Sequence, residues 1–365
     1  MTALVPLLVT LPLLGAAIAL VAGRHRRVQV GVSVVTLVLT LAIATVLLVA
    51  VDASNLPFAV SVGGWPVPFG IVLYVDRLAA LLVMVSSVVL LAVLLFSIGQ
   101  GAADGDDDTP VSIFHPTYLI LAAGIFVAFT AGDLFNLYVG FEILLVASYV
   151  LITLGNSEQR IRAGITYIVV SLVSSILFLS AIAMIYGATG TVNMVQLADR
   201  MTQLPQETQY VLHVMLLLAF AIKAAVFPVS FWLPDSYPTA PAPVTAVFAG
   251  LLTKVGVYAI IRTETQIFLE TVDDAPAAIS VVRRPGMEPV WGVSFSEIVD
   301  QAVRIPPRGS LAAYRLACAM PRTLPSEANL AREPADRARA SDDYRYVIAQ
   351  LGPCPRLREA PTIRY

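Results

Sequence analysis

Three ionisable side chains lie in the middle of long apolar stretches of this sequence. They are Glu142 in "NLYVGFEILLVASYVL", Lys223 in "LLLAFAIKAAVFP" and Lys254 in "VFAGLLTKVGVYAII". A charge at the centre of a bilayer costs about 2.5–3.5 kcal/mol, so such residues usually face a bundle interior and pair with one another. The three residues therefore predict a buried acid–base set at membrane depth.

Lysine is rare in this chain, which has two lysines and twenty-one arginines. Both lysines lie in apolar stretches. A buried lysine can lose its proton near neutral pH, whereas an arginine stays charged. Both lysines lie well inside their stretches, which makes it difficult for them to extend the amine to the bilayer surface. The pattern favours proton transfer over a purely structural role for Glu142, Lys223 and Lys254.

A proline adds a second signal beside the first lysine. Pro228 lies five residues after Lys223, and proline removes a backbone donor and kinks or breaks a helix. Broken helices at membrane depth occur beside the ion paths of transporters. We therefore expect the helix that carries Lys223 to break at Pro228.

Other charged residues lie near the ends of the apolar stretches. Asp76 and Arg77 start one of them, and two interpretations stay open: an ion pair at the membrane interface, or part of a proton relay. His115 and His213 are expected at the interface, and Asp133 and Asp235 in solvent; these four lie close to segment ends.

The composition indicates the elements that must position these side chains. The 365 residues are 58% hydrophobic and 13% charged, against about 45–50% and about 25% in soluble domains. Every backbone polar group in a bilayer must be satisfied internally, which predicts helices for the long apolar runs. We expect an all-α polytopic membrane protein with about eight transmembrane helices, the seventh broken at a proline. The segments are roughly 3–22, 29–51, 71–98, 112–131, 134–154, 163–187, 209–231 and 243–261.

Basic residues between the segments set the expected orientation. Arg24, Arg26 and Arg27 follow the first segment, and Arg160 and Arg162 follow the fifth. Short loops rich in Lys and Arg face the cytoplasm, and eight alternating crossings bring both clusters to one side. We expect a multi-pass protein of the plasma membrane with its N-terminus outside.

The remaining sequence offers no sign of a cofactor. No phosphate-binding loop, nucleotide fingerprint, zinc-ligand spacing or nucleophile motif occurs, and Cys318 and Cys354 both lie beyond the apolar segments. We expect no cofactor, no metal ion and no nucleic-acid partner. From about residue 270 onward, prolines recur among charged residues without a membrane-length apolar run, which predicts a poorly ordered hydrophilic tail.

Three motifs resemble a known family: "GDLFNLYVGFEILLVASYVL", "AFAIKAAVFPVSFWLPDSYPTAPAPVTAVFAGLLTKVGVYAIIR" and "GATGTVNMVQLA". They look like the antiporter-like membrane subunits shared by respiratory complex I and Mrp-type cation/proton antiporters, with the D subunits of the Mrp antiporters most similar. The resemblance covers about residues 1–268. It implies that Glu142 and Lys223 form a proton-carrying pair, that Lys254 relays the proton onward, and that Pro228 marks the break in the seventh helix.

The resemblance also implies a domain organisation. Residues 1–111 correspond to three N-terminal transmembrane helices, and residues 112–268 to the first of two inverted five-helix repeats. Residues 269–365 resemble neither, and we expect a truncated subunit with a non-homologous, frameshifted or disordered tail.

The function implied is that of a membrane subunit of a monovalent-cation (Na+)/proton antiporter. Its expected partners are other membrane subunits, protons, monovalent cations and the lipid bilayer, and in this interpretation the chain is not itself an enzyme. One alternative is a proton-translocating, non-redox subunit of a complex I-like NADH:quinone oxidoreductase. A second alternative is a non-functional fragment.

Overall fold

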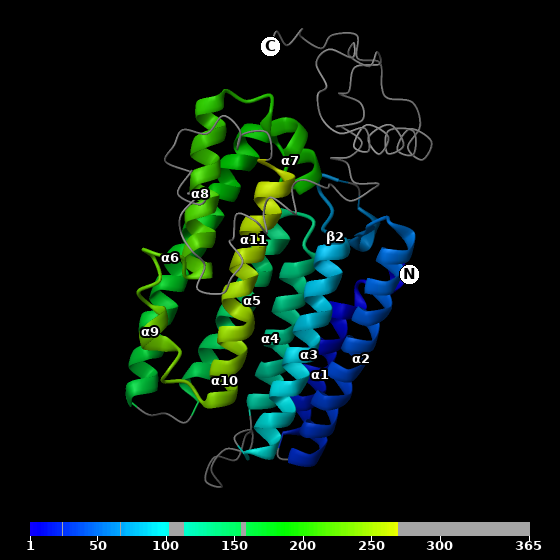
Figure 1. Ribbon diagram of the computed structural model, residues 1–365, viewed down its shortest axis with the longest axis vertical. Helices are drawn as coiled ribbons and strands as arrows, with labels where there is room; N and C mark the ends of the chain where they lie inside the picture. Colours follow the sequence, from blue (N-terminus) through cyan, green and yellow to red (C-terminus); the bar gives the residue numbers. More distant parts are fainter. Residues whose placement is uncertain (24, 66, 102–112, 155–157, 269–365) are drawn as a thin grey trace, which may run out of the picture. The chain divides into compact units, whose positions relative to one another are not determined.

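The computed structural model describes residues 1–23, 25–65, 67–101, 113–154 and 158–268 (Figure 1). Among the described residues, those within 1–53 and 57–268 form one compact unit, the main unit. The predictions for residues 269–365 lie outside the described residues.

Helices make up most of the described chain, as the apolar runs predicted. They are α1 (Leu7–Ala22), α2 (Arg26–Ser54), α3 (Arg77–Gly99), α4 (Phe114–Thr130), α5 (Leu134–Thr153), α6 (Glu158–Thr189), α7 (Met194–Met201), α8 (Gln206–Ala224), α9 (Leu233–Ser236), α10 (Ala242–Val247) and α11 (Thr253–Gln266). A π-helical turn, Phe248–Leu252, joins α10 to α11 into one continuous helix.

Seven helices in the described ranges are long and apolar enough to cross a membrane. They are Thr2–Ala22, Arg26–Ser54, Arg77–Gly99, Leu134–Thr153, Arg160–Thr189, Gln206–Ala224 and Ala242–Gln266. The remaining predicted segment is the fourth, 112–131, which forms the shorter helix α4 with 17 residues. The predicted fold class, a helical polytopic membrane protein, is confirmed.

The third predicted segment, 71–98, is helical only from Arg77 onward. Its first residues form strand β2 (Val72–Val75), which pairs antiparallel with β1 (Phe58–Ser61) so that Phe58 lies opposite Val75. Asp76 then caps α3, because its carboxylate accepts a hydrogen bond from the Ala79 N–H at 2.8 Å. The apolar run therefore combines a β-branched strand with a helix, which hydropathy alone does not separate.

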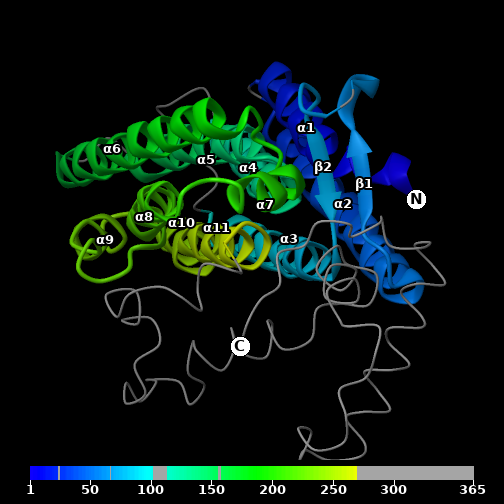
Figure 2. The same ribbon diagram turned by 90° about the horizontal axis from the view of Figure 1, so that it is seen from above.

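Helix α4 lies at the centre of the main unit. It packs against α1, α3, α5 and α11, as the view from above shows (Figure 2). Every α4 residue except Ile120 is buried. Its contact with α5 is close at Gly140, where an added Cβ would lie 2.9 Å from the backbone nitrogen of Ala128. This central position is the reason that a short helix can be apolar on all sides.

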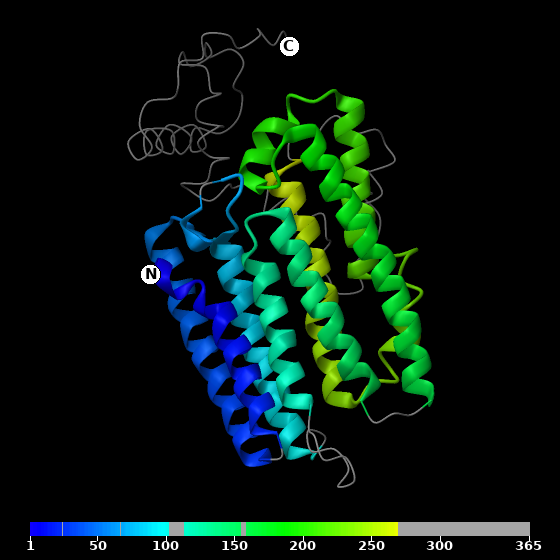
Figure 3. The same ribbon diagram turned by 180° about the vertical axis from the view of Figure 1, so that it is seen from behind.

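The outer helices present apolar side chains to their surroundings. The blue helices α1 and α2 lie on one side of the unit and the green helices α6 and α8 on the other (Figure 3). Large hydrophobic residues are exposed along the outer faces, among them Leu14, Ile18, Val35, Val49, Leu95 and Ile176. Such a surface suits a hydrocarbon environment rather than water.

Candidate functional site

Lys223 lies in the last turn of α8. The helix ends at Ala224, because Ala225 adopts a left-handed conformation with φ 54°, and Pro228 lies in the irregular segment that follows. The helix thus ends before the proline. Lys223 is thereby placed at a helix C-terminus, where the partial negative charge of the carbonyl groups stabilises a cation. The indole N–H of Trp232 donates to one of those carbonyls, that of Ile222, at 3.1 Å.

Glu142 and Lys223 meet through a serine. The Ser175 hydroxyl donates to Glu142 Oε1 at 2.5 Å, and Lys223 Nζ donates to Ser175 Oγ at 3.0 Å. Lys223 Nζ also donates to the carbonyl oxygen of Ser171 at 3.3 Å. Helices α5, α6 and α8 each contribute one member of this bridge, and a hydroxyl at its centre both accepts and donates.

The surroundings of the bridge are largely apolar. Lys223 Nζ lies 5.6 Å from the centre of the Phe141 ring, which stacks on Phe220 with ring centres 6.1 Å apart. Phe178 contacts Phe220 edge-on at 4.7 Å. Electrostatic interactions are stronger in such low-dielectric surroundings than in water, which favours attraction between the two charged side chains.

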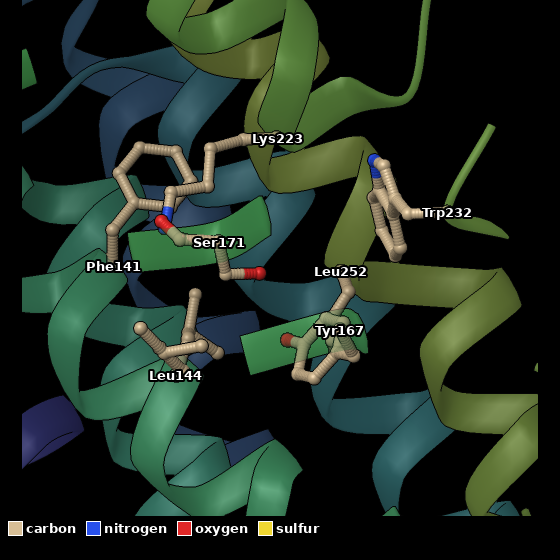
Figure 4. A pocket seen from close by; sticks show the side chains of 8 residues that line it. Phe141, Leu144, Tyr167, Ser171, Lys223, Trp232 and Leu252 are labelled. Atoms are coloured by element: carbon tan, nitrogen blue, oxygen red, sulfur yellow. The ribbon is translucent and has the colours of Figure 1, made fainter. Parts of the chain in front are cut away.

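A small cavity lies next to Lys223 (Figure 4). Its volume is about 30 Å³, and a cavity of about 10–15 Å³ on this measure holds one water molecule. The residues that line it are Phe141, Leu144, Leu145, Tyr167, Ser171, Lys223, Trp232 and Leu252. The lysine therefore has room for a water molecule beside it.

Lys254 does not join this cluster. Its side chain is exposed, and Nζ donates to the carbonyl oxygen of Ala249 at 2.5 Å and to Thr253 Oγ1 at 3.4 Å. It lies two residues after the π-helical turn, and such turns are frequent at functional sites. Its helix is nevertheless close to Lys223, since α11 packs against the end of α8 at Gly256.

Asp76 and Arg77 each form an ion pair, but not with one another. Arg262 binds Asp76 through two bonds, at 2.5 Å and 2.9 Å, whereas Arg77 pairs with the exposed Asp52 at 3.0 Å. Burial alone raises the pKa of Asp76, but the attraction of Arg262 and the bonds from Arg262 and the Ala79 N–H outweigh burial. They hold the pKa of Asp76 below its ordinary value of 3.8.

Arg262 is a residue that the sequence-based interpretation missed. Its guanidinium also donates to the Tyr258 hydroxyl at 2.7 and 2.9 Å, and Tyr258 donates to the Phe129 carbonyl oxygen at 2.8 Å. The cluster ties α3, α4 and α11 together. A signal for it was available, since Arg262 and Tyr258 lie four residues apart and so share one helix face.

Three of the other expectations for residues near segment ends need correction. His115 was expected at the interface but is fully buried at the start of α4. Asp133 was expected in solvent but is buried, where it accepts bonds from the N–H groups of Asn136 at 2.6 Å and Val72 at 3.3 Å. Burial raises its pKa more than these bonds lower it. His213 is also buried, with Nε2 2.6 Å from Glu264 Oε1, and its ring stacks on Phe268. Asp235 is exposed, as expected.

Comparisons with known proteins agree on one family. Residues 131–282 match the family described as NADH:quinone oxidoreductase/Mrp antiporter, TM. Over 269 residues the chain is 39% identical to the D subunit of the Na(+)/H(+) antiporter of Alkalihalophilus pseudofirmus, covering 73% of this chain and 54% of that protein. It is 43% identical over 210 residues to the corresponding D subunit of Bacillus subtilis, covering 57% of this chain and 42% of that protein.

Two solved structures share the fold. A chain of the Mrp complex from a Dietzia species superposes with a TM-score of 0.70 at 33% identity, covering 77% of this chain and 51% of that chain. A chain of the membrane-bound sulfane sulfur reductase, an archaeal respiratory membrane complex, superposes with a TM-score of 0.69 at 29% identity. This match covers 78% of this chain and 56% of that chain. The chain spans about half the length of the relatives that it matches. These matches and the helical fold show that it belongs to the family of the Mrp antiporter D subunits and the antiporter-like membrane subunits of complex I.

Proposed function

We propose that the chain acts as the D subunit of an Mrp-type Na+/H+ antiporter and that Glu142, Ser175 and Lys223 carry its proton. The observation that supports this most strongly is the Ser175 bridge between the two charged side chains. The identity with antiporter D subunits and the likeness to a chain of an Mrp complex support the cation exchange and the assembly with other membrane subunits.

The bridge can pass a proton without a large movement. As an Nζ–H bond of Lys223 breaks, the proton binds Ser175 Oγ, and the original hydroxyl proton of Ser175 moves to Glu142 Oε1. The serine is unchanged, one proton has moved from Lys223 to Glu142, and both end groups have become neutral. Hydrogen bonds on both sides of the hydroxyl place each acceptor within reach.

Lys254 and Pro228 have different roles in this proposal. Lys254 is the onward proton carrier, since it lies on the helix that packs directly against the end of α8. Pro228 keeps the chain irregular after Ala224, which leaves α8 carbonyl groups beside Lys223. The ion pairs formed by Asp76 and Arg77 support a structural role for both residues rather than a relay.

The proposal is tested in inside-out vesicles from an antiporter-deficient bacterium that produces the chain with the other Mrp subunits. A dye that reports the pH gradient measures proton movement after Na+ is added. Glu142→Gln and Lys223→Ala should abolish Na+-dependent proton movement with unchanged amounts of protein in the membrane. Glu207→Gln, at an exposed position in the first turn of α8, is the matched control and should exchange normally. Full exchange by Glu142→Gln would remove the proposed role of this residue.

The likeness to a respiratory membrane complex favours a second candidate, a proton-translocating subunit of a complex I-like enzyme. Isolation of the native complex through a tag on this chain separates the two. Co-purification of antiporter subunits supports the first candidate, and co-purification of redox subunits supports the second. The expected truncation stays a prediction, tested by reading the coding DNA beyond codon 269 in all three frames.

We also propose a plasma-membrane location with the N-terminus outside, supported by the arginines that follow α1 and by those near the start of α6. A Thr2→Cys variant that lacks Cys318 and Cys354 provides the test. An impermeant thiol reagent should label it in intact cells. Labelling only after the cells are permeabilised would place the N-terminus inside.

A further inference from the structure

The cavity beside Lys223 has one polar wall. Lys223, Ser171 and Tyr167 contribute this wall, and the rest of the lining consists of leucines and aromatic rings. Ser171 lies between the other two, with Lys223 Nζ beside it on one side and the Tyr167 ring on the other (Figure 4). A water molecule needs two to four polar partners to occupy a buried cavity. The three residues of this wall can provide enough partners for one water molecule.

Lys223 has a donor left for such a water. An ammonium group has three N–H bonds, and in the described part of the chain two of them are directed to Ser175 Oγ and the Ser171 carbonyl oxygen. Because Lys223 also lines the cavity, its third N–H has an acceptor only if the cavity supplies one.

The Tyr167 hydroxyl is held in a fixed orientation at the other end of this wall. It lies 2.7 Å from Ser148 Oγ, and Ser148 donates its single hydrogen to the Leu145 carbonyl oxygen at 3.0 Å. With that hydrogen directed to Leu145, Tyr167 is the donor to Ser148, and its oxygen, which also interacts with the Ser171 side chain, can accept a further bond. The Tyr167 ring packs against Trp232 and Phe248, with ring centres 5.5 and 6.5 Å away. Because Tyr167 lines the cavity, its hydroxyl can serve as an acceptor there.

We propose that Tyr167 is a positioning residue that holds water in this cavity against the ammonium group of Lys223. The Tyr167 hydroxyl oxygen and the Ser171 hydroxyl orient the water so that its oxygen accepts a hydrogen bond from the Lys223 ammonium group. The water then offers Lys223 a second route for proton exchange, in addition to Ser175. As Nζ–H breaks, the proton binds this water, which releases one of its own protons to the next water. The role in transport rests on the proposed function, whereas the hydration of Lys223 does not.

The two lysines make this hydration measurable, because lysine labelled with nitrogen-15 at the amine gives two side-chain signals, which Lys254→Arg assigns. The purified chain in lipid bilayers is studied by solid-state NMR with magnetisation transferred from water. The Lys223 signal should receive magnetisation rapidly, and Tyr167→Phe should remove most of that transfer. The exposed Lys254 should be unaffected and serves as an internal reference.

Two further variants control for packing. Tyr237→Phe removes another buried hydroxyl, which contacts the Phe248 carbonyl oxygen and does not line the cavity, so Lys223 should stay hydrated. Leu252→Phe fills the cavity while keeping the hydroxyl of Tyr167, and it should lower the transfer to Lys223. Equal transfer in wild type and Tyr167→Phe, or none in wild type, would overturn the inference.

Measuring Na+-dependent proton movement in vesicles separates this inference from the proposed function. Tyr167→Phe should slow Na+-dependent proton movement and alter its pH profile, whereas Glu142→Gln should abolish the movement. If Glu142→Gln exchanges normally while Lys223 is hydrated through Tyr167, the proposed function fails and the hydration site stands. If Glu142→Gln is inactive and Tyr167→Phe leaves both hydration and exchange unchanged, the function stands and this inference fails.

Discussion

Gly256 lies where α11 crosses the end of α8, and replacing it by alanine should displace the helix end that carries Lys223. An added Cβ would lie 2.6 Å from the Ala224 nitrogen, 2.8 Å from the Ala224 Cα and 2.9 Å from the Lys223 carbonyl carbon. Ordinary contacts begin at 3.4 Å, so the helices must separate by the difference, about 0.8 Å. All three neighbours are backbone atoms, which cannot rotate away as a side chain can.

The expected cost of Gly256→Ala follows from this overlap. Overpacking by one methyl group destabilises by about 1–3 kcal/mol, and each kcal/mol lowers the melting temperature of a domain of this size by about 2–4 °C. Thermal unfolding in detergent should therefore show a decrease of about 2–12 °C. Exchange should also fall, because the 3.0 Å bond from Lys223 to Ser175 lengthens when the end of α8 moves.

The matched control is Gly187→Ala. Gly187 lies inside helix α6, and an added Cβ there meets nothing within 4 Å. This change should leave exchange intact and leave stability unchanged or raised by about 0.5–1 kcal/mol, since alanine is the better helix residue. Wild-type melting and wild-type exchange in Gly256→Ala would refute the close approach of α8 and α11.

Further predictions concern the ion pairs and the serine bridge. Arg262→Ala should lower the unfolding free energy by about 3–5 kcal/mol because it leaves the Asp76 carboxylate without its partner, whereas Arg77→Ala at the exposed pair should cost less than about 1 kcal/mol. The lowered pKa of Asp76 means that its stabilisation is present above 3.8 and is lost as the pH falls through the lower native value. In acid titrations followed by melting temperature, Asp76→Asn should therefore be less stable at neutral pH and show a flatter decline below pH 4 than wild type. Ser175→Ala should slow vesicle exchange about tenfold or more, as the loss of a charge-assisted bond implies, while Ser180→Ala at an exposed α6 position should not; equal rates would argue against the bridge.

The sequence was sufficient to predict the membrane helices. Long apolar runs define spans because the bilayer leaves the backbone few alternatives, and Glu142 and Lys223 are conspicuous within them. The run 71–98 was misassigned in part because strand and helix residues are equally apolar there. Pro228 indicated a break, but the helix ends earlier, at a left-handed alanine that no pattern marks.

The contacts between side chains could not be predicted in the same way. Four serines lie on α6, and which of them faces Glu142 depends on how that helix is rotated against α5 and α8. The Asp76–Arg262 pair joins residues 186 positions apart, so it depends on the packing of α3 against α11. Lys254 was expected to share the polar path, yet it is exposed within the described residues and bonds to its own helix.

The central claim is that Lys223 gives up and regains a proton during cation exchange. Lys223→Arg tests this most directly, because arginine keeps the positive charge but does not release its proton under physiological conditions. In vesicles that contain the full set of subunits, this variant should reach the membrane in wild-type amounts and show no Na+-dependent proton movement. Exchange at the wild-type rate by Lys223→Arg would contradict the account, since a fixed charge would then be sufficient.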